Sequence, residues 1–257
     1  MLVMDSGLGG LSVVRALKAA APDATLTYLA DTAYFPYGSR SAEQLDTRAQ
    51  TLLKALEKTT PLAAVVLACN TLSTLCLATL RAALPHAFVG TVPAIKTAAA
   101  QSHNKRFSLL ATPNTAHSSY TSELIADFAE GCVVDAVGAD HLAEMAEAVL
   151  LGEPVAEADL ARAIAPAFCD DAQGRTDAVV LGCTHYPLIL DRLRAVAPWD
   201  VRWIDSGEAI ARRALSLAQE DMRPARSIAY VTRAEDIAGY RAVFMREGFD
   251  AVEALTL

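Results

Sequence analysis

Short runs of apolar residues alternate along the chain with longer stretches rich in alanine and leucine, and this alternation constrains the fold most. Runs such as 65–67 and 179–181 are continuously apolar, as expected of strands that helices cover on both faces. The pattern therefore predicts an α/β fold with mostly parallel sheet. The predicted strands are Leu2 to Met4, Thr25 to Leu29, Ala63 to Ala68, Phe88 to Thr91, Phe107 to Ala111, Val133 to Val137, Ala178 to Leu181 and Val201 to Ile204, and the predicted helices include Leu11 to Ala20, Ala42 to Lys58, Leu142 to Leu151 and Ala209 to Glu220.

Two kinds of strand ending occur twice. Asp5-Ser6-Gly7 has a counterpart in Asp205-Ser206-Gly207, and Cys69-Asn70-Thr71 has one in Cys183-Thr184-His185. The first repeat has a simple alternative explanation, since Asp and Ser are preferred at helix N-termini. The paired cysteines predict two pseudo-symmetric α/β lobes with the active site in a cleft between them. We expect lobe 1 to comprise residues 1–92 and 206–257, and lobe 2 residues 93–205.

Composition excludes several classes of protein. The 257 residues are 53% hydrophobic, which is enough for a large core and excludes a disordered chain. A net charge of -8 disfavours a protein that binds nucleic acid. The apolar runs are far shorter than the roughly 20 residues of a membrane span. Met1 leads directly into the first strand without a secretion signal, so we expect a cytoplasmic protein, with a homodimer left open.

The motifs give no sign of a cofactor. The glycine turn at residues 7–10 lacks the dinucleotide fingerprint because Ser12 stands where a further glycine is needed, and no Walker A, HExxH or EF-hand motif is present. We therefore expect no cofactor and no metal. The cysteines form no CxxC pair, and their odd number fits neither a disulfide framework nor a zinc site. They are Cys69, Cys76, Cys132, Cys169 and Cys183.

Cys69 and Cys183 are the candidate catalytic residues. Each follows a predicted buried strand and precedes a predicted helix, whose N-terminus favours a reactive thiolate. A cysteine hydrolase needs only one thiol, and a dithiol enzyme needs two within disulfide reach. Inverting a carbon centre needs one base on each face, which a matched pair supplies.

The other cysteines, two charged residues and two turns are also considered for a role in the site. Asp5 and His185 are candidates to assist the two sulfurs, although Asp5 is equally explained as a helix cap and His185 as a helix-start residue bonded to backbone. Cys76, Cys132 and Cys169 are expected to be buried apolar filler. A Pro/Gly turn at 35–39 and a strand end at 111–115 look suited to ligand binding, with an ordinary loop and helix capping by Thr115 as the alternatives.

Four motifs, in order, resemble those of the glutamate racemases in the cofactor-independent aspartate/glutamate racemase superfamily, and they cover most of the chain to about residue 207. They are Asp5-Ser6-Gly7-Leu8-Gly9-Gly10-Leu11, Ala30-Asp31-Thr32 with Phe35-Pro36-Tyr37-Gly38-Ser39, Ala68-Cys69-Asn70-Thr71, and Gly182-Cys183-Thr184-His185-Tyr186-Pro187-Leu188.

The resemblance implies an isomerase that interconverts L- and D-glutamate by 1,1-proton transfer and supplies D-glutamate for peptidoglycan. It implies that Cys69 acts on the α-hydrogen of D-glutamate with help from Asp5. Cys183 would act on that of L-glutamate with help from His185. The residues implied to hold the small-molecule substrate are Ser6, Pro36, Tyr37, Gly38, Asn70, Thr71, Thr115 and Thr184.

Some positions depart from the family pattern. Leu72 stands where a small residue is usual, and Asn114 where glycine is typical, so both could reshape the pocket. A family glutamate has no clean match, and Glu144 and Glu147 are unranked candidates for it. Three alternatives stay open: a racemase of aspartate, a hydrolase or amidase that uses one cysteine, and a small-molecule binding protein on the same scaffold.

Overall fold

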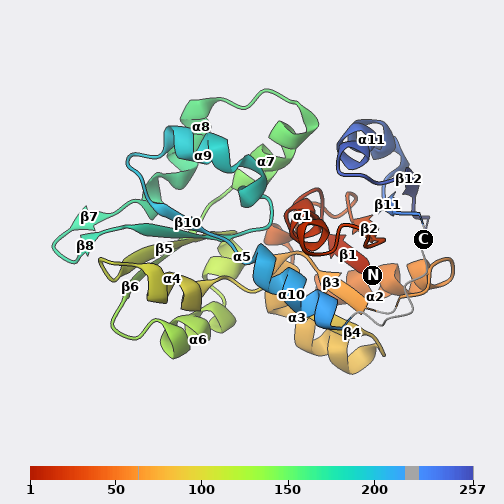
Figure 1. Cartoon of the computed structure of the whole chain (residues 1–257), viewed down its shortest axis with the longest axis horizontal. Helices are drawn as coiled ribbons and strands as arrows, with labels where there is room; N and C mark the ends of the chain where they lie inside the picture. The colour runs from red at the N-terminus through yellow and green to blue at the C-terminus, as the bar shows by residue number, and fades with distance from the viewer. Residues whose placement is uncertain (63, 218–225, 257) are drawn as a thin grey trace. The chain divides into compact units, whose positions relative to one another are not determined.

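The computed structural model describes residues 1–62, 64–217 and 226–256, and the chain forms two compact units (Figure 1). Unit 1 comprises Met1–Thr91 with Gly207–Leu257, and unit 2 comprises Val92–Ser206. The predicted lobes differ from these units by one residue at each boundary, and their existence as separate folding domains stays a prediction. Within the described ranges, no helix is long and apolar enough to cross a membrane.

Unit 1 is built on a parallel sheet with the strand order β12-β11-β2-β1-β3-β4. Every residue of β1 and β3 is buried, as the continuous apolar runs predict. The first and last of these strands in the chain are more than 200 residues apart, so both ends of the chain complete one sheet. The strands are β1 (Leu2–Asp5), β2 (Thr27–Ala30), β3 (Ala64–Leu67), β4 (Ala87–Gly90), β11 (Ile228–Val231) and β12 (Ala251–Ala254).

Helices cover both faces of the unit 1 sheet. Alternate strand residues such as Met4 and Leu67 share a core with helices α2 and α3, whereas Tyr28 points to the other face and packs on Phe244 of α11. Helix α10 packs on α1 and against β3 and β4. The helical elements are α1 (Leu11–Ala20), η1 (Tyr37–Ser39), α2 (Ala42–Glu57), α3 (Asn70–Ala83), α10 (Gly207–Leu217), η4 (Ala234–Asp236) and α11 (Ile237–Arg246).

Unit 2 has a smaller parallel sheet in the order β10-β9-β5-β6 and an antiparallel hairpin, β7-β8. Figure 1 shows α8 and α9 on one side of the sheet and α4 and α6 on the other, each side with its own apolar cluster. The strands are β5 (Arg106–Ala111), β6 (Val133–Gly138), β7 (Asp170–Asp171), β8 (Gly174–Arg175), β9 (Ala178–Gly182) and β10 (Arg202–Ile204). The helical elements are α4 (Ile95–Gln101), α5 (Pro113–Ala116), α6 (Ser119–Phe128), α7 (Leu142–Leu151), α8 (Glu157–Ile164), η2 (Ala165–Ala167), η3 (Tyr186–Ile189) and α9 (Leu190–Val196).

The two sheets share an arrangement, which confirms the prediction of similar lobes. Across the sheet, the strands lie in the order β2-β1-β3-β4 in unit 1 and β6-β5-β9-β10 in unit 2. In both units the first of these four strands along the chain lies between the second and the third, and the fourth lies beside the third. Cys69 follows β3 and Cys183 follows β9, so the two cysteines are structurally equivalent. Asp5 ends the first strand, whereas Asp205 follows the fourth, so the Asp-Ser-Gly repeat does not mark equivalent positions and that part of the prediction is wrong.

The predicted α/β class and parallel sheets are confirmed, and the pattern missed mainly the C-terminal part. Strands β11 and β12 were not predicted, nor was the β7-β8 hairpin, whose strands are only two residues long. A two-residue strand has too few side chains to show any period. Ala63 and residues 218–220, which were assigned to a strand and a helix, lie outside the described residues.

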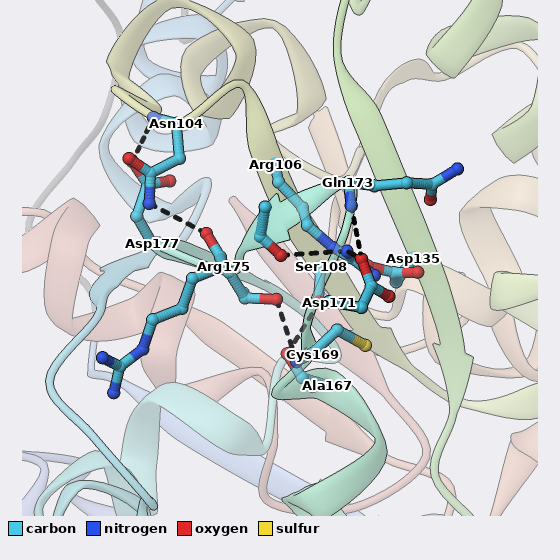
Figure 2. A network of polar contacts seen from close by, with 12 residues as sticks. Asn104, Arg106, Ser108, Asp135, Ala167, Cys169, Asp171, Gln173, Arg175 and Asp177 are labelled. Carbon is cyan, nitrogen blue, oxygen red and sulfur yellow. Dashed lines mark hydrogen bonds and ion pairs between the residues drawn. The ribbon is translucent and has the colours of Figure 1, made fainter.

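A polar network holds the hairpin against the amino end of the unit 2 sheet (Figure 2). The Arg106 side chain is 3% exposed; its Nε donates to Asp135 at 3.1 Å and its Nη1 to the Gly174 carbonyl at 3.0 Å and to Asp171. Ser108 donates to the Ala167 carbonyl at 2.7 Å. Arg106 begins β5, at the sheet edge opposite to the one that Cys183 follows. The network therefore lies at the amino edge of the sheet, and the candidate site residue Cys183 lies at the carboxyl edge.

Candidate active site

Cys69 stands at the N-terminus of a long helix. It occupies the N-cap position of α3 in an extended conformation and is 7% exposed. Its carbonyl accepts the first helical hydrogen bond, from the Ser73 N–H at 2.9 Å. Asn70 and Thr71 form the first turn and are buried. The positive end of the helix dipole therefore lies at the sulfur and favours a thiolate there, as the sequence predicts.

Asp5 lies beside Cys69 because β1 and β3 are paired neighbours in the sheet. The Met4 carbonyl accepts from the Ala68 N–H at 2.8 Å, which brings the ends of the two strands together. The Asp5 carboxylate is fully buried, and its Oδ2 accepts from the Gly10 N–H at 2.9 Å. The N-cap of α1 is Gly10, whereas Asp5 is the last residue of β1, so Asp5 is not the cap of this helix.

The Pro/Gly turn brings a phenol to the same place. Tyr37, in η1, is buried and its hydroxyl donates to Asp31 Oδ2 at 2.8 Å. Burial raises the pKa of Tyr37 well above its ordinary value, and the charges of Asp31, Cys69 and Asp5 raise it further. The phenol therefore stays protonated, and it is close enough to Cys69 and Asp5 to sense both. Pro36 and Gly38 flank it and are half-buried.

Cys183 lies within reach of an imidazole that a carboxylate holds in turn. The distance from Cys183 Sγ to His185 Nδ1 is 3.8 Å, and the distance from His185 Nε2 to Glu147 Oε2 is 2.7 Å. The three residues are 7%, 2% and 4% exposed. Both ring nitrogens thus engage side chains, so the interpretation of His185 as a residue bonded only to backbone is wrong.

The electrostatics of the row formed by Cys183, His185 and Glu147 favour a charged imidazolium. Burial alone would lower the pKa of His185, but hydrogen bonds with Cys183 and Glu147 outweigh burial and raise the pKa well above 6.5. A pKa raised by folding stabilises the protein fully below the unfolded value of about 6.5, and that contribution disappears as the pH rises through the folded value. Near neutral pH the imidazolium can therefore balance a thiolate at Cys183.

The chain after Cys183 differs from the prediction of a helix. The Tyr186 N–H donates to the Cys183 carbonyl at 3.1 Å, and η3 is a short 3₁₀ turn. Helix α9 begins only at Leu190, so the dipole of an α-helix does not act directly on this thiol. Tyr186 is fully buried, and burial and the nearby Cys183 raise the pKa of its phenol. The sequence predicts no role for Tyr186.

Comparison with known proteins agrees with these features. Residues 10–214 match the model of the family described as Asp/Glu/Hydantoin racemase. A glutamate racemase of Brucella anthropi is 46% identical over 238 residues, covering 90% of this chain and 86% of the relative. A glutamate racemase of Agrobacterium fabrum is 47% identical over 218 residues, covering 84% and 80%. The chain belongs to the Asp/Glu/Hydantoin racemase family.

A solved structure extends the similarity to the whole chain. The Escherichia coli glutamate racemase, crystallised with L-glutamate and the activator UDP-MurNAc-Ala, has a TM-score of 0.92 and 40% identity, covering 99% of this chain and 97% of that one. The resemblance found in the motifs is confirmed, as is the assignment of the chain to a family of isomerases.

The two candidate glutamates, Glu144 and Glu147, lie in different surroundings. Glu147 is buried beside His185, whereas Glu144 is partly exposed and contacts His141 at 3.3 Å. The buried residues of α7 are Leu142, Ala143, Ala146 and Glu147, so Glu147 lies on the apolar face. A carboxylate on the apolar side of a predicted helix is the signal that could have identified this partner of His185.

The other residues of the racemase motifs follow the carboxyl ends of the strands. Thr115 is fully buried inside α5, and the N-cap of α5 is Thr112, so capping by Thr115 is not its role. Leu72 is fully buried in the core with α2, so it fills that core. Asn114 is in α5 and half-buried. The remaining predicted substrate-binding residues, Ser6 and Thr184, are both buried.

The three other cysteines differ from one another. Cys76 is fully buried, and burial raises the pKa of its thiol to about 12. Cys132 and Cys169 are partly exposed, so the expectation of buried filler holds only for Cys76. Both partly exposed cysteines lie outside the regular strands that carry the site. Among the described residues, no group of His, Cys, Asp and Glu side chains could hold a metal ion.

Proposed function

We propose that this protein is a glutamate racemase in which Cys69 and Cys183 are the two bases. The observation that carries the proposal is the equivalence of the two thiols, one after β3 and one after β9, each with its own charged partners. Two relatives at 46% and 47% identity are glutamate racemases, and the E. coli structure holds L-glutamate.

In the proposed reaction from L-glutamate, the Cys183 thiolate removes the α-proton. The C–H bond breaks, its electron pair stays on the α-carbon, and an S–H bond forms at Cys183. The Cys69 thiol then gives its proton to the opposite face of the carbon, which leaves Cys69 as a thiolate and yields D-glutamate. The reverse reaction exchanges the roles.

The partners of each sulfur suit these steps. His185, held by Glu147 at 2.7 Å, balances the thiolate form of Cys183. On the other side, Asp5 and the helix N-terminus of α3 accompany Cys69. The ammonium and the two carboxylates of glutamate would be held by the polar groups at the sheet edges. These are Ser6, Pro36, Tyr37, Gly38, Asn70, Thr71, Thr115 and Thr184.

The Cys183, His185 and Glu147 row also favours a second candidate, a cysteine amidase. A thiol, an imidazole and a carboxylate in sequence activate a nucleophile in such enzymes. An amidase would form a covalent thioester on Cys183 and would leave the equivalent Cys69 without a function. Mass spectrometry of the protein quenched during turnover of glutamine distinguishes the two, since proton transfer adds no covalent mass.

The test of the proposal is exchange of the α-hydrogen. In D2O, we expect L- and D-glutamate each to lose the α-proton signal in the NMR spectrum and to lose optical activity by circular dichroism, without added cofactor. Aspartate is measured in parallel, because exchange with aspartate alone would assign the enzyme to the other acidic amino acid. No exchange with either would reject the racemase proposal.

We also propose that the enzyme works in the cytoplasm and supplies D-glutamate for peptidoglycan, as the family resemblance implies. A bacterial strain that lacks its own glutamate racemase requires added D-glutamate for growth. Expression of this chain should remove that requirement, and a Cys69→Ala variant should not. Growth that still needs D-glutamate despite soluble, active enzyme would contradict the proposed supply.

A further inference from the structure

Asp31 is a fully buried carboxylate to which the proposed reaction gives no role. It directly follows β2 at the carboxyl edge of the unit 1 sheet, and its N–H donates to the Asp5 carbonyl at 2.9 Å. Burying a carboxylate is strongly unfavourable unless it is paired and hydrogen-bonded. The hydrogen-bond partners of Asp31 should therefore indicate its role.

Three side chains from distant segments donate to this carboxylate. Arg48 of α2 donates from Nη2 to Oδ1 at 2.7 Å and from Nε to Oδ2 at 3.0 Å. Thr232, just after β11, donates to Oδ1 at 2.8 Å. Tyr37 donates to Oδ2 at 2.8 Å. The bidentate arginine holds the carboxylate in place, so the carboxylate is a fixed acceptor for the phenol.

This arrangement determines which hydrogen bonds Tyr37 can still make. A phenol has one hydrogen to donate, and Tyr37 gives it to Asp31. The lone pairs on the Tyr37 oxygen remain, so toward its other neighbours the oxygen can only accept. Tyr37 and Cys69 belong to the same core cluster, and η1 packs against α3, which Cys69 caps. The charges of Cys69 and Asp5 both act on the phenol. The phenol is thus prevented from donating to the thiolate of Cys69.

We propose that Asp31, held by Arg48 and Thr232, is a positioning residue that fixes the hydroxyl of Tyr37 as a hydrogen-bond acceptor beside Cys69. The oxygen then orients Cys69 by accepting from its S–H, and it gives the thiolate no hydrogen bond from the phenol, which keeps the thiolate more basic than such a bond would. The inference deepens the proposed racemase function and rests on it for the role of Cys69 as a base. The arrangement of the hydroxyl itself does not depend on that function.

The test is a double-mutant cycle of Asp31→Asn and Tyr37→Phe. If Asp31 acts through the hydroxyl, Asp31→Asn should lower kcat about 10-fold, the worth of one hydrogen bond to a charged group, with KM within about twofold. In the Tyr37→Phe background the same change should cost about twofold or less. Equal costs in the two backgrounds, or no loss from either single variant, would overturn the proposal.

A second readout does not need racemase activity. The rate at which iodoacetamide alkylates Cys69 is followed against pH by peptide mass spectrometry. Asp31→Asn frees the phenol to donate to the thiolate, so the midpoint of the alkylation profile should move to lower pH, and it should move much less in the Tyr37→Phe background. An equal shift in both backgrounds overturns the inference. A wild-type protein without α-hydrogen exchange instead rejects the proposed function, and the alkylation result still decides the role of Asp31.

Two controls separate positioning from stability. Asp135→Asn removes a carboxylate from the buried Arg106, which lies at the amino edge of the unit 2 sheet, and should leave kcat unchanged. If Asp31→Asn does not fold, Thr232→Val takes its place, since it removes one donor and keeps the Arg48 ion pair. Thr232→Val should show the same dependence on Tyr37 with a smaller loss, and independence from Tyr37 overturns the proposal.

Discussion

Cys69 and Cys183 occupy equivalent places in two similar sheets, yet their surroundings differ. Cys69 caps a 14-residue helix and has a carboxylate and a phenol beside it. Cys183 precedes a 3₁₀ turn and has an imidazole at 3.8 Å, which a buried carboxylate holds. The order of the strands repeats, whereas the backbone after each cysteine and the charged partners do not.

The difference shows that a repeated strand end determines where a thiol stands, and its neighbours determine which charge state it favours. A helix N-terminus acts on Cys69 through backbone dipoles, which carry no proton. His185 can carry a proton and so responds to pH. If the two thiols act as the proposed bases, their pH dependence should therefore differ.

The strongest test of the equivalence is to remove each thiol. Cys69→Ala and Cys183→Ala should each abolish racemisation in both directions, because a single base cannot deliver a proton to the opposite face. The loss should reach at least about 10³-fold, within the range of general acid–base catalysis. Circular dichroism with each enantiomer measures it. Full activity in either variant would end the two-base scheme.

The next test concerns the partner that only Cys183 has. Glu147→Gln removes the carboxylate that raises the pKa of His185, so the imidazolium is lost at lower pH. The alkaline limb of kcat/KM for L-glutamate should move to lower pH, with a loss of about 10- to 100-fold at its former optimum.

Glu144→Gln is the matched control for this test, since Glu144 lies on the same helix and is partly exposed. It should leave the pH profile unchanged. If the two variants shifted the profile equally, the pairing of Glu147 with His185 would not explain the effect.

A third test exchanges the residues that precede the cysteines, Ala68 and Gly182. A Cβ on Gly182 would lie 2.6 Å from Leu109 Cδ1 and 2.9 Å from Ala111 Cβ. Gly182→Ala should therefore lower the free energy of unfolding by about 1–3 kcal/mol, the usual cost of overpacking. Ala68→Gly should cost about 1 kcal/mol, from lost packing and backbone entropy. Urea denaturation measures both, and an unaffected Gly182→Ala would show that unit 2 can adjust there.

The smallest effect is expected at a third cysteine, Cys76, on the helix that Cys69 caps. Because burial raises the pKa of its thiol to about 12, iodoacetamide should not modify it in the folded protein at pH 8. Cys76→Ala should change kcat by less than about twofold. Rapid alkylation of Cys76 would show that α3 opens, and the selectivity expected for Cys69 would then need another explanation.

The sequence predicts the sheets well because both faces of each strand are covered. Strands such as β3 and β9 are continuously apolar, and that signal is local. The cysteine positions follow from it, since Cys183 comes directly after β9 and Cys69 comes two residues after the end of β3. The helix predicted after Cys183 was wrong because the chain makes i to i+3 bonds there.

The partners of the site were harder to predict because they come from distant segments. His185 was named, but its bond to Glu147 joins residues 38 positions apart. Asp31 and Thr232 are 201 positions apart. Nothing local in the sequence indicates such a pairing. The Asp-Ser-Gly repeat misled because a three-residue match carries no information about strand order.

The chain order of unit 1 has a consequence for how the protein is made. Unit 2 is continuous in sequence, whereas the unit 1 sheet needs β11 and β12 from the end of the chain. The segment that forms unit 2 is therefore synthesised before β11 and β12, on which the unit 1 sheet depends. Thr232 can reach Asp31 only after β11 has been made, so the surroundings of Tyr37 are completed later than the whole segment of unit 2.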